Sequence, residues 1–596
     1  MSFFVSLLYP AIIILFSVFI YKIPFIKKLI KENAKILILF FFVCLFFGNV
    51  FLFLHLRQEQ YIYFWDFSGF WRKSVEFNVA LDKDVWDTLK MTYESMLYQE
   101  YSYFPEWFLS LPIMIIGNTF PRFVIAMFNF FVMPANLLLA IMVIWVKDRL
   151  SIKSSMFIVV SFTFIILFTA NILPMKLGYI GSAGLPFIGF VMLTMLTMKM
   201  DELDIKKAMF IGLNLVIIVL VRRWFSYVAV SYFIAIPSIY LLLCFVNRDF
   251  NHEKFKSFLL NMFISGVSAL LILAVGFFPL LKTFITYDYQ LAYQSAKIGG
   301  YLYALEWFKT FYSPLITALF ILGLIEGIMN RKLRFLTLAY SASILIIILL
   351  FYRIQVFGSH HYYIINMYVA FVTILGFVFL FTRIPKKISP IIGLFLIIAM
   401  VANFALLFVK REGTLINRAL DFFQPLSTSL YYPPRYREDV DTIRDIATYL
   451  DETPKDHEYV YVLAGSADFT DDVLRNAWFP EKLNSVRNIE PTRQLDTRDG
   501  VPSLFFKYSY VVVTDPIQYH NGEEFQRVIG ILADGMLHDE ELRAYYYLEK
   551  TFTIKDDIKV YIYKLIEDIP FEIIDKYSKK FKALYPDLPF LYEFVY

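Results

Sequence analysis

Two polar clusters in this chain have residue types that could move a proton and bind a phosphate. Asp66 stands inside the aromatic run 61–71, where a carboxylate held among rings can act as a positioned general base. Arg222 and Arg223 are adjacent, and two guanidinium groups can grip a phosphate through parallel hydrogen bonds. Each cluster also has a plainer interpretation, because aromatic runs anchor proteins at membrane interfaces and arginines reach out to lipid phosphates.

Two further clusters are rich in histidine and tyrosine. The segment 353–363 contains an arginine and the adjacent His360 and His361. Adjacent histidines without carboxylates at fixed spacing are a poor metal pattern, so this segment fits either hydrogen bonding to an anionic group or a polar turn. The segment 282–312 holds Asp288 among tyrosines, which would either face a sugar or lipid headgroup or serve as interface anchors.

The composition says what kind of protein must position these residues. Hydrophobic residues make up 58% of the 596 residues and charged residues 18%, with a mean hydropathy of +0.58. That is too little polar surface for a water-soluble chain. The net charge of +4 argues against a nucleic-acid partner, which requires a concentrated basic face. Two cysteines without metal-type spacing exclude a disulfide framework and give no metal site.

Apolar runs of spanning length fill the first two-thirds of the chain, and they predict a polytopic α-helical membrane protein with about twelve transmembrane helices. The expected spans are 3–22, 35–55, 122–146, 155–173, 185–199, 207–221, 226–246, 257–281, 313–329, 336–352, 363–382 and 389–409. The apolar segment 107–120 contains Pro112 and Gly117 and is too short to cross, so we expect a helix at the outer interface.

Lysine and arginine in the short loops assign the two sides of the membrane. Alternate loops carry 20 of them, at 22–35, 147–153, 199–207, 248–256, 331–334 and 383–387. The positive-inside rule places these loops in the cytoplasm. Both termini and all four polar clusters are then expected outside, together with a long outer loop at 57–121.

A polar part is expected to follow the spans. We predict a transmembrane domain at 1–410 and an extracytoplasmic α/β domain at 411–596, with Pro433 and Pro434 near the boundary. Its expected helices are 438–450, 523–532 and 576–582, and its expected strands are 459–464, 510–514 and 557–563. Asp468, Asp471 and Asp472 either bind a cation or begin a helix, and a helix start is the more common use of such residues.

With these residues in order, the chain resembles the GT-C superfamily of membrane glycosyltransferases, such as the protein O-mannosyltransferases and the bacterial aminoarabinose transferases. The resemblance rests on Trp65-Asp66 and Gly69-Phe70-Trp71 in the first outer loop, the short amphipathic helix after them, and the general plan of the chain. It implies that Asp66 is the catalytic base. Many relatives have an Asp-Glu pair here, whereas Phe67 follows Asp66, so Glu100, Glu106 or Asp288 would supply a second acid.

The resemblance further implies an inverting transfer of a sugar from a polyprenyl-phosphate donor to a cell-surface glycan in a bacterial wall. The donor phosphate would be held by Arg222, Arg223, Arg353, His360 and His361. A phosphate leaving group requires no metal or other cofactor, although the sequence leaves a carboxylate-bound divalent ion open. The alternatives are a transporter or flippase of lipid-linked saccharides, a scaffold, and a polymerase or ligase of lipid-linked glycans.

Overall fold

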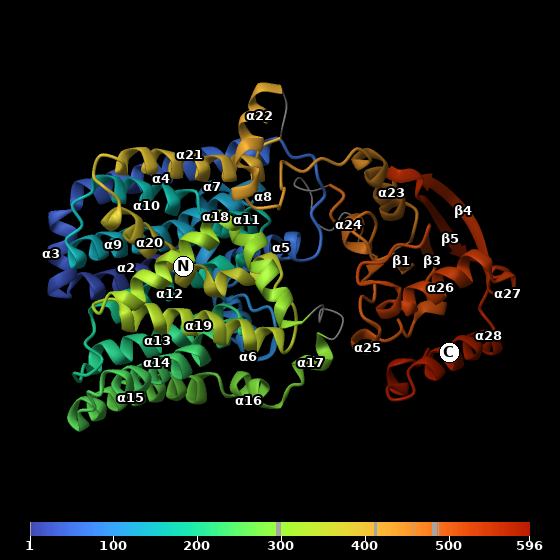
Figure 1. Ribbon diagram of the computed structural model, residues 1–596. Coiled ribbons are helices and arrows are strands. Elements are labelled where there is room, and N and C mark those ends of the chain that lie inside the picture. Colours follow the sequence, from blue (N-terminus) through green and yellow to red (C-terminus); the bar gives the residue numbers. More distant parts are fainter. Residues whose placement is uncertain are drawn as a thin grey trace. The chain divides into compact units, whose positions relative to one another are not determined.

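The computed structural model describes residues 2–293, 300–410, 414–455, 457–478, 486 and 488–595, so Gly299 and Arg411 lie outside the described residues (Figure 1). The described chain divides into two compact units. The first is formed by residues 2–58, 70–287 and 300–434, and the second by residues 59–69, 288–293 and 435–595. The predicted boundary between a transmembrane domain at 1–410 and an α/β domain at 411–596 stays a prediction.

The first unit is entirely helical in its described residues. Its elements are α1 (Ser2–Ser6), α2 (Leu8–Tyr21), α3 (Pro24–Glu32), α4 (Ala34–Arg57), α5 (Asp66–Lys83, which begins in the second unit), α6 (Val85–Tyr98), α7 (Phe104–Ile116), α8 (Phe120–Met127), η1 (Phe128–Val132), α9 (Met133–Leu150), α10 (Ser155–Ile166), α11 (Thr169–Lys176), η2 (Ile180–Gly184), α12 (Leu185–Thr197), α13 (Ile205–Val221), η3 (Arg223–Phe225), α14 (Ser226–Asn247), α15 (His252–Gly276), α16 (Phe278–Thr286), α18 (Tyr301–Met329), α19 (Arg334–Tyr352), η5 (Ser359–Tyr362), α20 (Tyr363–Arg383), α21 (Ser389–Phe408), α22 (Thr414–Phe423) and η6 (Gln424–Leu426).

Eleven helical segments within the described residues are long and apolar enough to cross a membrane. The protein is therefore a polytopic helical membrane protein, as the composition predicts. The expected span at 207–221 corresponds to α13, whose 17 residues rise about 26 Å, slightly less than the hydrocarbon core of a bilayer. The helix α7 has 13 residues and rises only about 20 Å, so it is too short to cross.

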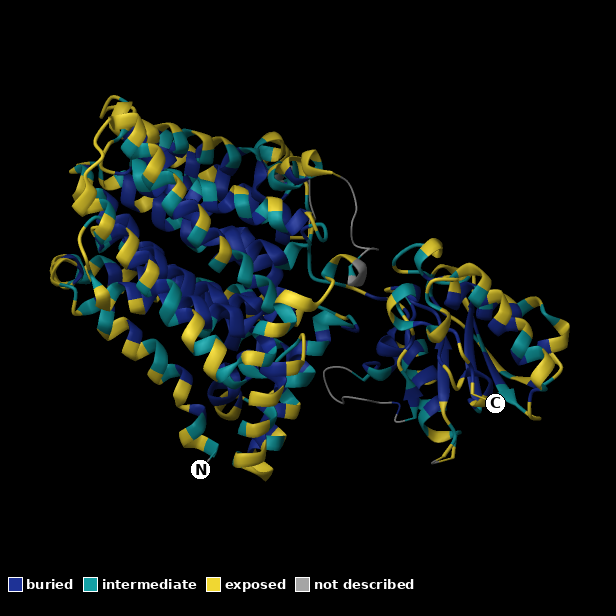
Figure 2. Cartoon of the chain, turned by 90° about the horizontal axis from the view of Figure 1, so that it is seen from below, coloured by how far each residue is buried: buried dark blue, intermediate teal, exposed yellow. Residues whose placement is uncertain are grey.

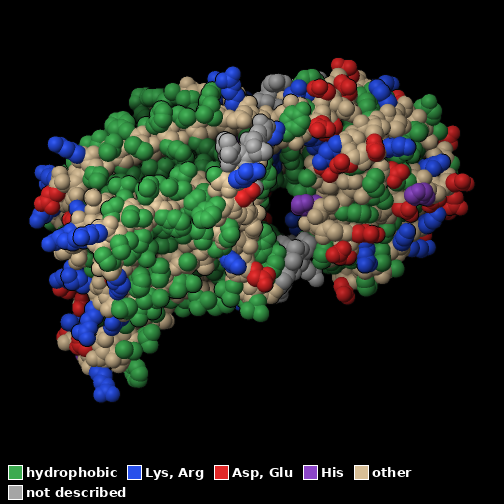
Figure 3. All heavy atoms as spheres, turned by 45° about the horizontal axis from the view of Figure 1, so that its top comes forward, with side chains coloured by type: hydrophobic (Ala, Val, Ile, Leu, Met, Phe, Trp, Pro, Cys, Tyr) green, Lys and Arg blue, Asp and Glu red, His purple; other side chains and the backbone are tan. Residues whose placement is uncertain are grey.

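The surface of the first unit is that of a lipid-facing bundle. Large apolar side chains are exposed along its spans, including Phe46 at 72%, Phe245 at 84% and Val275 at 84%, and apolar atoms cover much of the face in Figure 3. Lysine and arginine side chains gather at the left end of this unit in that view. A soluble domain does not expose this many large apolar side chains to water, so the surface also indicates a membrane protein.

The second unit is an α/β domain with a five-stranded sheet in the order β2-β1-β3-β5-β4. Strand β1 pairs in parallel with β2 and β3, whereas β5 pairs antiparallel with β3 and β4. The elements are α17 (Tyr289–Ala292), α23 (Val440–Glu452), β1 (Val460–Leu463), α24 (Asp471–Arg475), β2 (Ile489–Glu490), α25 (Asp496–Asp499), η7 (Phe505–Lys507), β3 (Tyr510–Asp515), η8 (Glu523–Phe525), α26 (Arg527–His538), α27 (Glu540–Arg543), β4 (Tyr546–Thr553), η9 (Lys555–Asp557), β5 (Lys559–Leu565), α28 (Phe571–Leu584) and η10 (Pro589–Leu591).

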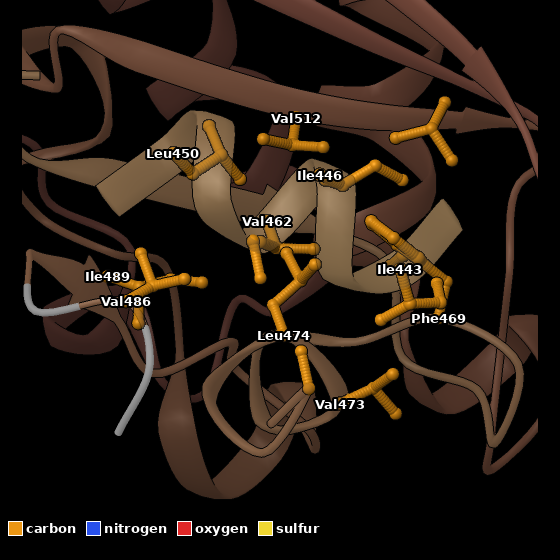
Figure 4. Close-up of a cluster of buried hydrophobic side chains, with 14 of the residues drawn as sticks. Ile443, Ile446, Leu450, Val462, Phe469, Val473, Leu474, Val486, Ile489 and Val512 are labelled. Atoms are coloured by element: carbon orange, nitrogen blue, oxygen red, sulfur yellow. The ribbon is translucent and has the colours of Figure 1, made fainter. Parts of the chain in front are cut away.

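Alternating side chains of the central strands build a core on each face of this sheet. In β3, Tyr510 and Val512 join the core formed with α23 and α24, whereas Val511 and Val513 join the core formed with α26 and α28. The alternation follows from the two-residue period of a strand. Figure 4 shows the first core, and Figure 2 shows the buried central strands.

The segment 59–69, which is expected from the sequence to lie in the long outer loop 57–121, is part of this α/β domain. Ile62 and Phe64 are 1% and 3% exposed and belong to the core under α23. The Gln60 N–H donates to the Arg435 carbonyl at 2.9 Å, and the Arg437 N–H donates to the Gln60 carbonyl at 2.8 Å. The aromatic run therefore contributes to a protein core.

Candidate functional site

A buried cation marks the candidate site in the first unit. Helix α13 begins at Ile205, within the basic segment 199–207, and ends at Val221, so Arg222 lies at the opposite end of this helix. Arg222 leaves the helix in an extended conformation and is 7% exposed. Its guanidinium carbon lies 3.9 Å from the ring centroid of Tyr101, 4.9 Å from that of Phe70 and 5.6 Å from that of Trp224. Aromatic faces attract a cation and hold the guanidinium in place.

A buried acid lies within electrostatic reach of this arginine. Glu106 is in the first turn of α7 and is 0% exposed. Neither of its carboxyl oxygens has a hydrogen-bond partner on another described residue. Burial raises the pKa of Glu106 to about 7, against the opposing effects of Lys73 and Arg222. A carboxyl group with a pKa near neutrality is suited to donate or accept a proton at physiological pH.

Lys73 on α5 completes this group of charges. Its Nζ donates to the Tyr101 carbonyl and lies 4.4 Å from the centroid of the Tyr103 ring. Burial lowers the pKa of Lys73, and the carboxylates of Glu106 and Glu76 oppose that effect. The three elements α5, the first turn of α7 and the end of α13 thus bring two cations and one acid together.

The histidine pair lies against the same aromatic side chain as Arg222. The rings of His360 and His361 are 3.8 Å apart, and His360 stacks on Tyr179 at 4.2 Å. Trp224 packs edge-on to His361 at 5.4 Å. The Gly358 N–H donates to Nδ1 of His361 at 2.8 Å, so a neutral His361 carries its proton on Nε2.

Several donors of this site have no acceptor among the described residues. They are Nη1 of Arg222, Nε and Nη2 of Arg223, and Nε1 of Trp224. Buried donors are nearly always paired in folded proteins, and a cation left without a partner is strongly destabilising. This arrangement therefore suits an anion with several acceptor oxygens, for which a phosphate group is the simplest example.

Three of the sequence-predicted residues are exposed. Arg353 is exposed just after α19, and Glu100 is exposed in the turn after α6. Asp288 is exposed, accepts a hydrogen bond from the Gln290 N–H at 2.9 Å, and belongs to the second unit. Glu106, the third acid proposed as an alternative, is buried and lies within electrostatic reach of Arg222. The roles expected for Arg353, Glu100 and Asp288 stay predictions.

Asp66 is the first residue of α5 and is half-buried in the second unit. Its place beside the arginines of the first unit stays a prediction.

Two of the acids at 468–472 lie at the start of a helix. Asp471 and Asp472 are the first residues of α24, and Asp472 accepts hydrogen bonds from the segment 59–69. Among the described residues, no group of three or more His, Cys, Asp or Glu side chains could hold a metal ion.

Two lysines near this end of the bundle were missed by the sequence analysis. Lys73 follows Asp66 by seven positions, and its amphipathic helix was hidden in a segment read as a loop. Lys176 is 0% exposed, and its Nζ lies 2.7 Å from Nε2 of His55. The sequence signal that was available for Lys176 is its position at the end of a span opposite the basic loops. A lysine at that end departs from the positive-inside distribution and indicates a functional role.

No family model matches the chain, and no curated protein matches it. Among solved structures, the chain is similar to the crystal structure of ArnT from Cupriavidus metallidurans bound to undecaprenyl phosphate. The likeness covers 89% of this chain and 98% of that chain, with 12% sequence identity and a TM-score of 0.43. A likeness this distant assigns neither a family nor an activity to the chain.

Proposed function

We propose that this protein is an inverting glycosyltransferase of the GT-C type, which moves a sugar from a polyprenyl-phosphate donor to a cell-surface glycan on the outer side of the membrane. The donor is a polyprenyl phosphate that carries the sugar, so its tail lies in the bilayer while its phosphate and sugar lie at the end of the helices. The extracytoplasmic position of the second unit is part of this proposal.

One observation carries the proposal: buried guanidinium donors that have no acceptor on any described residue lie at the end of α13 away from the basic loops. Charged groups at the ends of membrane helices are costly and mark sites of function. A phosphate on a lipid can supply the missing acceptors at this depth. Arg222 would bind the phosphate through the N–H groups of its planar guanidinium, and Arg223 and His361 would donate further hydrogen bonds to it.

The reaction follows from these roles. The acceptor hydroxyl oxygen attacks the anomeric carbon of the sugar from the face opposite the phosphate. As the new C–O bond forms, the bond from carbon to phosphate oxygen breaks, and its electron pair stays on the phosphate. Arg222 and Arg223 stabilise this developing charge, which is worth roughly 3–4 kcal/mol of barrier for one such contact. Asp66 takes the proton of the hydroxyl group, and backside attack inverts the anomeric centre.

The test is transfer by the purified full chain in proteoliposomes that contain a polyprenyl-phosphate sugar labelled in the sugar. We expect labelled glycan and free polyprenyl phosphate to appear together. Arg222→Ala should lower the transfer rate at least a hundredfold, whereas Arg331→Gln at the basic end of α19 should leave it unchanged. Movement of intact lipid-linked sugar between leaflets, without cleavage, would instead make the protein a flippase.

A further inference from the structure

The α/β domain of the second unit contacts the chain on both sides of Asp66. The side chain of Asp472, at the start of α24, accepts hydrogen bonds from the Trp65 N–H and, at 3.3 Å, from Oγ of Ser68. Nδ2 of Asn476 donates to the Tyr63 carbonyl at 3.0 Å and to Oγ of Ser68 at 2.9 Å. These contacts join residues more than 400 positions apart in the sequence.

The turn that these contacts hold is not a relaxed one. Trp65 has a φ of +47°, in the left-handed region that bulky residues rarely adopt. Such a conformation persists only where the surroundings determine it, and it is found most often at functional sites. Helix α5 begins at the next residue, Asp66, so the conformation of Trp65 sets the direction of Asp66 and the first turn of α5.

The polar contacts lie in a buried setting. Ser68 and Asn476 are 0% exposed, and Asp472 is 6% exposed. Ile62 and Phe64 fix the preceding residues in the domain core. Apolar contacts alone would suffice to hold this segment against the domain. The hydrogen bonds to Asp472 and Asn476 additionally fix the backbone geometry next to Asp66.

We propose that Asp472, Asn476 and Ser68 are positioning residues for the transfer reaction, through which the α/β domain holds Asp66 in the geometry that proton removal requires. The inference rests on the proposed role of Asp66 as the base. A base displaced by about 1 Å loses on the order of a hundredfold in rate. The C-terminal domain is then a working part of the catalytic apparatus, in addition to any contact that it makes with the acceptor.

The experiment compares steady-state transfer by Asp472→Ala, Asp472→Asn and Ser68→Ala in the full chain, below the unfolding temperature of each variant. Asp472→Ala should lower kcat by about thirtyfold to a hundredfold with little change in KM for the donor. Asp472→Asn keeps an oxygen in place and should recover most of the activity. Ser68→Ala removes one hydroxyl group and should lower kcat by about tenfold.

The matched control is Asp496→Ala, at the first residue of α25 in the same domain. Asp496 is 2% exposed and accepts hydrogen bonds from the N–H groups of Arg527 and Val528 and from the Tyr585 hydroxyl. Its loss should lower the unfolding temperature as much as Asp472→Ala does while leaving kcat unchanged. An equal loss of kcat in this control would show that only domain stability matters and would overturn the inference.

The Asp66→Asn background separates the two proposals. If Asp472 acts through Asp66, then Asp472→Ala and Ser68→Ala should cause no further loss of rate in this background. If the rate losses of Asp66→Asn and Asp472→Ala multiply in the double variant, the positioning role is overturned while the role of Asp66 as the base is not. A wild-type kcat for Ser68→Ala would have the same meaning. Full activity of Asp66→Asn would remove the base itself, and with it the basis of the positioning role.

Discussion

Replacing Glu106 with glutamine should remove a pH dependence of stability that the buried carboxyl group creates. The pKa of Glu106 is raised from 4.5 to about 7, chiefly by burial. The folded protein therefore binds this proton more tightly than the unfolded chain does. The stabilisation is complete below pH 4.5, declines as the pH rises, and is lost above about pH 7. Since each tenfold change in proton affinity is worth about 1.4 kcal/mol, the full effect is about 3 kcal/mol.

The assay follows the unfolding of wild type and Glu106→Gln by denaturant in mixed micelles from pH 5 to pH 8. Glutamine has the shape of the protonated acid and does not titrate. The stability of the wild type relative to Glu106→Gln should fall by about 2.5 kcal/mol over this range. Other titrating groups are common to both proteins and cancel in the difference to first order.

A second pair of variants controls for the substitution itself. Glu94 on α6 is exposed and lies 3.9 Å from Lys90, so Glu94→Gln is a matched control that makes the same substitution at the surface. A stability difference between the wild type and Glu106→Gln that changes with pH no more than the difference for Glu94→Gln does would refute the burial of Glu106.

Three further outcomes are expected. Asp66→Asn should keep its expression and fold but lose transfer by about a hundredfold or more, measured as the initial rate of glycan labelling, because a missing general base costs at least that much. Arg222→Lys keeps the charge but loses the planar fork, so the transfer rate should fall by about tenfold to a hundredfold; unchanged kinetics would contradict bidentate phosphate binding. Lys73→Met removes the largest effect that opposes the rise in the pKa of Glu106, so the stability transition should move above pH 7; a downward move would contradict this placement of Lys73.

The membrane part was the most predictable because spanning helices must satisfy their own backbone and expose apolar side chains. Eleven of the twelve expected spans overlap helical segments of at least 18 residues in the described chain, such as 35–55 within α4 (Ala34–Arg57). The segments that overlap 185–199 and 313–329 start earlier, at Ile180 and Tyr301. The remaining expected span, 207–221, corresponds to α13, which has 17 residues.

The α/β domain was predictable where its strands are buried on both faces. The apolar run at 510–514 gave β3 in nearly its observed length (Tyr510–Asp515). In contrast, β4 lies at the edge of the sheet and exposes most of its side chains, so its sequence lacks an apolar pattern. The two-residue β2 has too few residues to give one.

The site was predictable in its residue types but not in its grouping. The aromatic run 61–71 has the same composition whether it meets lipid or a protein core, and only tertiary contacts place Ile62 in the core of the α/β domain. Glu106 resembles an ordinary acid in the first turn of a helix, where acids favour the helix dipole. Its complete burial depends on the chain around it, which no local pattern reveals.

Proton uptake should accompany donor binding because the acid and the phosphate share the same cation. Arg222 helps to lower the pKa of Glu106, and a phosphate bound to Arg222 would cancel that help and repel the carboxylate. The pKa of Glu106 then rises above 7 in the complex, and binding weakens as the pH increases. Titration calorimetry with undecaprenyl phosphate at pH 7, in two buffers of different ionisation enthalpy, measures this uptake. On donor binding, wild type should take up to about half a proton more than Glu106→Gln does. Protons taken up by the phosphate itself are common to both proteins and cancel in this difference. Equal uptake by the two proteins would mean that the phosphate binds beyond the reach of Glu106, and that the cluster around Arg222 is not the donor site.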